Sequence, residues 1–129
     1  MGGVTASLVA ARCGARVVYV AALLPRAGVA LKDLLAEMVF DDLGFERRGG
    51  LDFFEDEDAR WRGLDPELMR GQAVAPYFDV LEDPVPGTYV GCRFDRVVRP
   101  DFQALHADVW LDSGHAPQAE CPEALAALL

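Results

Sequence analysis

Apolar and polar positions follow two alternating periodicities along the chain, which predicts helices and strands in turn. Residues 1–12 are rich in small side chains and predict a helix, with Gly14 as its left-handed cap. Residues 17–24 begin with β-branched side chains and are apolar on both alternating faces, and Pro25 ends the run. Such a run is typical of a strand that is covered on both faces, as in a parallel sheet between helices.

The stretch from 26 to 86 differs in character from both ends of the chain. It holds a segment with helical spacing at 31–38, a segment with an N-cap and proline at 65–69, and loop-like runs between them. We therefore expect an irregular helical insertion here. The length of 129 residues suggests one domain, which would span 1–129 and contain this insertion.

The end of the chain returns to short strands that alternate with short helices. Strands are expected at 88–92 and 107–111, and helices at 100–106 and 121–129. Strands that alternate with helices imply parallel pairing with right-handed crossovers. The expected fold class is therefore α/β, with a small parallel sheet of about three strands flanked by helices.

The composition supports a packed domain and narrows the choice of partner. Hydrophobic residues make up 52% of the chain and charged residues 26%, which argues against disorder. The 21 acidic and 12 basic residues give a net charge of −9, and a strongly acidic surface repels nucleic acid and anionic membranes.

No apolar run approaches the ~18 residues of a membrane span, and no secretory signal opens the chain. The three cysteines are far apart, so we expect a cytoplasmic protein without a disulfide framework or a metal site.

Two residues carry the candidate chemistry, and each follows an expected strand. Asp95 comes just after the strand at 88–92, and His115 comes just after the strand at 107–111. Because the carboxyl ends of neighbouring parallel strands share one edge of a sheet, we expect the two side chains to lie side by side. A carboxylate beside an imidazole is the orienting half of a nucleophilic triad. Spacing alone leaves open the alternative of two turn residues without contact.

Four segments of the chain are more specific, taken together in their order, than any one of them alone. The chain opens with Met-Gly-Gly-Val, and residues 18–28 hold a strand followed by Pro-Arg-Ala-Gly. Residues 89–100 contain Asp95, and residues 111–126 contain His115. In this order the segments resemble the end of the nucleophile elbow Gly-x-Ser-Met-Gly-Gly, the strand before the lid, the acid loop and the histidine loop of bacterial α/β-hydrolases. The resemblance runs nearly end to end and is weakest from 41 to 76.

The resemblance assigns roles to particular residues. It implies that Asp95 is the triad acid, that His115 is the general base, and that 26–86 is the lid. Met1 would stand directly after the nucleophilic serine, where the family uses a backbone N–H as an oxyanion donor. The serine and the strands before it would precede residue 1. We therefore expect a truncated esterase-like hydrolase of small-molecule esters that retains two triad members, is inactive alone and uses no cofactor.

Other reactive side chains are expected to have structural roles. Ser113 is expected to shape its turn, Ser7 to pack on the first helix, and Cys92 to be a small buried hydrophobe. His106 falls at a helix end, where it would be a charge partner, and the acidic run 55–58 would be a solvated face. Five aromatic residues of the insertion either line an apolar acyl pocket or pack within the lid: Phe53, Phe54, Trp61, Tyr77 and Phe78.

Two further functions remain open at this point. A carbon–carbon lyase of the hydroxynitrile-lyase type would use the same Asp95 and His115. A non-catalytic interaction protein would instead use the edge of the strand at 17–24, which the missing neighbouring strand leaves open. An open apolar edge of this kind also predicts marginal stability or self-association through 17–24.

Overall fold

The computed structural model describes residues 2–38, 75–80 and 82–129, and the remaining residues, Met1 among them, lie outside the described part of the chain. Of the expected insertion at 26–86, only the two ends are described, and the expected helix at 65–69 lies outside. In chain order the described elements are α1 (Gly2–Cys13), β1 (Val17–Val20), α2 (Leu31–Met38), the 3-10 helix η2 (Ala75–Phe78), β2 (Gly87–Cys92), α4 (Pro100–Gln103), β3 (Val109–Leu111), α5 (Pro117–Glu120) and α6 (Pro122–Ala126).

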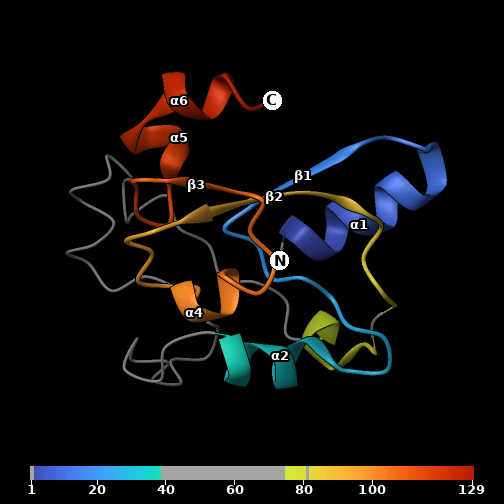
Figure 1. Ribbon diagram of the computed structural model, residues 1–129. Helices are drawn as coiled ribbons and strands as arrows, with labels where there is room; N and C mark the ends of the chain where they lie inside the picture. Colours follow the sequence, from blue (N-terminus) through green and yellow to red (C-terminus); the bar gives the residue numbers. More distant parts are fainter. Residues whose placement is uncertain (1, 39–74, 81) are drawn as a thin grey trace.

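The three strands form one parallel sheet in the order β1-β2-β3 (Figure 1). Tyr19 of β1 stands opposite Tyr89 of β2, and Val90 of β2 stands opposite Val109 of β3. Parallel pairing requires a crossover between consecutive strands, and the link from β2 to β3 runs through α4. The expected α/β class with a small parallel sheet of three strands is confirmed.

The first strand ends four residues earlier than its apolar pattern predicts. β1 stops at Val20 because Ala21 adopts a φ of +43°, a left-handed conformation that costs energy for a residue with a Cβ atom. Two hydrogen bonds hold this bend against β2. The Ala21 N–H donates to the carbonyl of Val90 over 2.9 Å, and the Tyr89 hydroxyl donates to the carbonyl of Ala22 over 2.8 Å. Past the bend, Ala22 and Leu24 pack against the cluster that contains Tyr19 and Tyr89, whereas Leu23 belongs to a separate cluster.

Helices cover both faces of the sheet, as the two-sided apolar pattern of the strands predicts. One face packs against α1 through a cluster that includes Ala10, Tyr19 and Tyr89. The other face packs against α6 through Val90 and Leu125 with neighbouring side chains. Figure 1 shows α5 and α6 on the side of the sheet opposite to α1 and α4. Burying a large apolar side chain contributes about 1.5–3 kcal/mol, so these clusters hold the layers together.

A third cluster lies beyond the carboxyl ends of the strands and joins α1, the insertion and the loop after β2. Its buried members are Leu23, Leu31, Leu34, Tyr77, Val97 and Val98, and Val4 and Phe102 are among the side chains packed against it. The first turn of α1 therefore lies at the same edge of the sheet as the loop that carries Asp95. A Cβ atom on Gly3 would stand 2.5 Å from the carbonyl oxygen of Leu23, which shows how closely α1 approaches the chain there.

The polar contacts of α1 fix its position along β1. The Ser7 hydroxyl is buried and accepts a hydrogen bond from the Val85 N–H over 2.9 Å, and the Tyr19 hydroxyl donates to the Val85 carbonyl over 2.9 Å. Ser7 is thus a packing residue, as expected. Gly14 has a φ of +67° and its N–H donates to the carbonyl of Ala10 over 2.8 Å, which confirms it as the left-handed cap.

Candidate active site

The loops after β2 and β3 are joined by backbone hydrogen bonds that extend the sheet. The Arg93 N–H donates to the carbonyl of Leu111 over 3.0 Å, and the Phe94 N–H donates to the carbonyl of Ser113 over 3.0 Å. These bonds carry the parallel pairing past the ends of both strands. They place Asp95, one residue after Phe94, next to the turn that carries His115.

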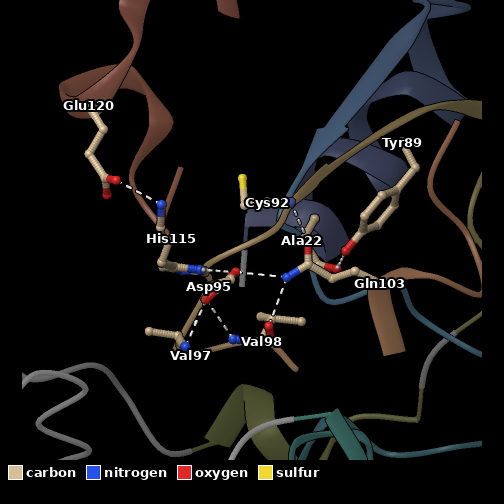
Figure 2. Close-up of polar contacts among 10 residues, drawn as sticks. Ala22, Tyr89, Cys92, Asp95, Val97, Val98, Gln103, His115 and Glu120 are labelled. Atoms are coloured by element: carbon tan, nitrogen blue, oxygen red, sulfur yellow. Dashed lines mark hydrogen bonds and ion pairs between the residues drawn. The ribbon is translucent and has the colours of Figure 1, made fainter. Parts of the chain in front are cut away.

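The structure brings the two expected site residues into contact. The His115 Nδ1 stands 3.0 Å from the Asp95 Oδ2 (Figure 2). The Asp95 side chain has no exposed surface, whereas 27% of the His115 side chain is exposed. A carboxylate only accepts hydrogen bonds, so Nδ1 is the donor and carries the hydrogen. Nε2 is then the ring nitrogen that can accept a proton, and the alternative of two turn residues without contact is excluded.

Four hydrogen-bond donors surround the Asp95 carboxylate. Its Oδ1 accepts from the N–H of Val97 over 2.7 Å and from the N–H of Val98 over 3.0 Å, as in a tight turn led by an aspartate. Its Oδ2 accepts from the Nε2 of Gln103 over 2.9 Å and from His115. A carboxylate offers about four acceptor sites, and four donors fill them here. This compensates for the loss of water around a buried charge, which otherwise costs several kcal/mol.

Gln103, at the end of α4, is the residue of this network that the sequence analysis missed. Its side chain is fully buried, its Oε1 accepts from the Cys92 N–H over 2.8 Å, and its Nε2 also donates to the Val98 carbonyl over 2.7 Å. Figure 2 shows Gln103 pointing from α4 toward Asp95. The only signal in the sequence was an amide on a short helix that follows the acid by eight residues (103 − 95).

The turn that carries His115 is fixed by Glu120 from α5, a short helix that the sequence pattern did not predict. The Glu120 Oε2 accepts from the Gly114 N–H over 2.7 Å, and Figure 2 shows Glu120 reaching toward this loop. A Cβ atom on Gly114 would stand 2.8 Å from the Glu120 Oε1, so a larger residue would displace the carboxylate. The histidine loop is therefore held at its start by β2 and at its end by α5.

The serines and the nearest cysteine are not activated nucleophiles in this arrangement. Ser113 is 1% exposed, and its hydroxyl has no hydrogen-bond partner among the described residues. Ser7 is occupied by Val85. Cys92 is buried, as expected, and burial raises the pKa of its thiol to about 11. The described residues thus hold an acid and a base, without a hydroxyl bonded to His115.

The raised pKa of Cys92 predicts a loss of stability at alkaline pH. The thiol in the unfolded chain ionises near its ordinary pKa of 9.0, whereas the folded protein keeps it neutral to about 11. The unfolded state therefore releases its proton first, so the free energy of unfolding should fall as pH rises from about 9 to about 11. Urea unfolding across this range should show the decline, with a smaller pH slope in Cys92→Ala. Cys13→Ala is the control, because Cys13 is exposed. If the free energy of unfolding declined equally with pH in Cys92→Ala and in Cys13→Ala, the Cys92 thiol would not be the group that causes the decline.

The other candidates from the sequence separate into three groups. Burial lowers the pKa of His106, and its ring lies 5.0 Å from the ring of Phe102, so the structure disfavours the charged role expected for it. Tyr77 is buried in the cluster beyond the strand ends, as in ordinary lid packing, whereas Phe78 is 61% exposed. The remaining candidates lie outside the described residues: Met1, Phe53, Phe54, Trp61 and the acidic run 55–58.

Within 2–38, 75–80 and 82–129, no group of three or more His, Cys, Asp or Glu side chains is arranged to hold a metal ion. In the same ranges, no helix has both the length and the apolar character that crossing a bilayer requires.

Comparisons with known proteins agree with this architecture. Residues 1–128 match the Alpha/beta hydrolase family. A crystal structure of a novel pyrethroid hydrolase, PytH, with BIF is similar to this chain, with a TM-score of 0.59 and 20% sequence identity. The similarity covers 98% of this chain and 65% of that one, so the chain spans somewhat less than two thirds of the length of that hydrolase. A comparison with curated proteins found no match.

Proposed function

The chain belongs to the alpha/beta hydrolase family, and we propose that it supplies the acid and the base of a carboxyl-ester hydrolase. The observation that carries the proposal is the 3.0 Å contact between the His115 Nδ1 and the fully buried Asp95 Oδ2. In this role Asp95 is the triad acid and His115 the general base. The nucleophile is a serine of a Gly-x-Ser motif directly ahead of Met1, where the family motif places it.

The chemistry follows from the hydrogen bonds of the imidazole. The serine hydroxyl gives its proton to the His115 Nε2 while its oxygen attacks the ester carbonyl carbon, and Asp95 stabilises the imidazolium through Nδ1. The imidazolium then returns the proton to the leaving alcohol as the carbon–oxygen bond breaks. Water attacks the acyl-serine with the same base, which releases the carboxylic acid and restores the serine. The backbone N–H at the Met1 position is proposed as one oxyanion donor.

The packing of α1 supports this source of the nucleophile. Val4, in the first turn of α1, packs against the cluster that contains Val97 and Val98. The N–H groups of these two valines bind the Asp95 carboxylate. A serine placed just before α1 would therefore lie at the same edge of the sheet as the acid loop.

The proposal is tested by turnover of 4-nitrophenyl acetate. The polypeptide of residues 1–129 is expected to show no turnover above the buffer rate, because no serine is bonded to His115. The genomic sequence upstream of the Met1 codon is expected to encode a Gly-x-Ser motif in frame, and the protein expressed with it is expected to hydrolyse the ester. Turnover by residues 1–129 alone that disappears in His115→Ala would overturn this division of the triad.

The open side of β1 supports a second proposal, association through this strand. β1 pairs with β2 on one side, and no described strand pairs with its other side. Leu8 and Val9 of α1, the helix packed on this strand, are 48% and 56% exposed. An unpaired apolar edge favours pairing with another chain.

Sedimentation of residues 1–129 should therefore show association that increases with protein concentration. Lysine at Val9, which is 56% exposed on α1, should weaken it, whereas lysine at Ala124, exposed on α6, should not. A monomer with a sharp thermal transition that does not depend on concentration would exclude this association.

A further inference from the structure

Gln103 connects three parts of the site through one buried amide group. Its Oε1 accepts from the end of β2 at Cys92, and its Nε2 donates both to the acid loop at Val98 and to the Asp95 carboxylate. We propose that Gln103 is a positioning residue, which acts through Asp95 to hold His115 in the tautomer with hydrogen on Nδ1. This inference rests on the proposed function, in which Nε2 must be free to accept the serine proton.

The partners of the amide allow only one orientation. The Cys92 N–H requires an acceptor, whereas the Val98 carbonyl and the Asp95 Oδ2 require donors. A rotated amide would place Nε2 against the Cys92 N–H and Oε1 against two other oxygens. In a fully buried group such unpaired contacts cost several kcal/mol together. The amide therefore always presents an N–H to Asp95.

The fixed amide determines how the carboxylate faces the histidine. The side-chain torsion of an aspartate has broad minima, so a carboxylate held at one oxygen can still rotate. Val97 and Val98 hold Oδ1, and Gln103 holds Oδ2 from α4. With three donors in place, the remaining acceptor site of Oδ2 faces the His115 Nδ1. Without Gln103, Oδ2 would lose its second donor, and the carboxylate could turn away from the imidazole.

The test uses residues 1–129 and the ¹⁵N chemical shifts of His115, which distinguish the two tautomers without any substrate. Gln103→Met keeps the length of the side chain and removes the amide. The share of the Nδ1–H tautomer is expected to fall at least about twofold, because the carboxylate no longer points at Nδ1. Gln118→Met, at an exposed position of α5, is the matched control and should leave the tautomer unchanged. An unchanged tautomer in folded Gln103→Met overturns the proposal.

A measurement on the wild-type protein covers the case in which Gln103→Met does not fold. The Gln103 side-chain amide protons should exchange slowly with solvent, and exchange as fast as that of the exposed Gln118 amide overturns the proposal.

The kinetic readout separates positioning from substrate binding. In the protein that carries the upstream Gly-x-Ser motif, Gln103→Met is expected to lower kcat about 10–100-fold with little change in KM, the cost of a misplaced base. Because the tautomer is measured without substrate, a protein that holds the Nδ1–H form through Gln103 but hydrolyses no ester would contradict the proposed function alone. Equal tautomers in wild type and Gln103→Met would contradict this inference alone.

Discussion

Replacing His115 by glutamine should nearly abolish ester hydrolysis in the protein that carries the Gly-x-Ser motif ahead of Met1. The serine would lose the imidazole that is bonded to Asp95, and removal of the histidine of a triad lowers kcat by about 10⁵–10⁶-fold. That loss corresponds to about 7–8 kcal/mol of transition-state stabilisation. Initial rates with 4-nitrophenyl acetate measure it directly.

The chain provides a matched control in its second histidine. His106 follows α4, and its ring packs against the rings of Phe102 and Tyr89. The structure records no contact between His106 and Asp95. His106→Gln should therefore change kcat by less than about tenfold, through packing alone. If both variants kept the wild-type kcat, or if His106→Gln caused the larger loss, His115 would not be the base.

Replacing Asp95 by asparagine should cause the second largest loss, about 10⁴-fold in kcat, with the fold retained. The N–H groups of Val97 and Val98 require an acceptor, so the new amide oxygen takes the place of Oδ1. The new NH₂ group then takes the place of Oδ2, where it forces the His115 Nδ1 to accept and removes the acceptor of the Gln103 Nε2. The hydrogen moves to Nε2, and the base can no longer take the serine proton.

Two measurements distinguish this result from a general loss of structure. The ¹⁵N shifts of His115 should report the Nε2–H tautomer in Asp95→Asn, while urea unfolding should still show a cooperative transition. Asp112→Asn is the matched control on the histidine loop, because Asp112 forms an exposed ion pair with Arg93. Such pairs contribute about 0–1 kcal/mol, so the control should keep its activity within about fivefold. An active Asp95→Asn with an Nδ1–H imidazole would contradict the assignment of the acid.

The order of elements in this chain could be predicted from local pattern, and their ends could not. A β-branched run that is apolar on both faces indicated β1, short strands between helical segments indicated its parallel neighbours, and small residues indicated α1, because these signals are local in the sequence. The end of β1 depends on Ala21, whose left-handed backbone is held by its bond to Val90 across the sheet. The helix α5 is only four residues long, and its contact with the histidine loop is a single side-chain hydrogen bond from the Gly114 N–H to Glu120, which no periodic pattern marks.

The positions of Asp95 and His115 in the candidate site could be predicted for the same reason, because the strands that precede them have a local pattern. Asp95 and His115 each follow a strand, and parallel strands bring their carboxyl ends together whatever the intervening sequence. The sequence by itself therefore predicted that Asp95 and His115 each follow a strand, and the resemblance of their two segments to the acid and histidine loops of α/β-hydrolases singled them out as partners. Only the tertiary structure decided how they meet. Gln103 lies eight residues after Asp95 and Val98 lies three residues after it, so these hydrogen bonds are close in sequence, but the direction of a hydrogen bond leaves no periodic trace along a chain.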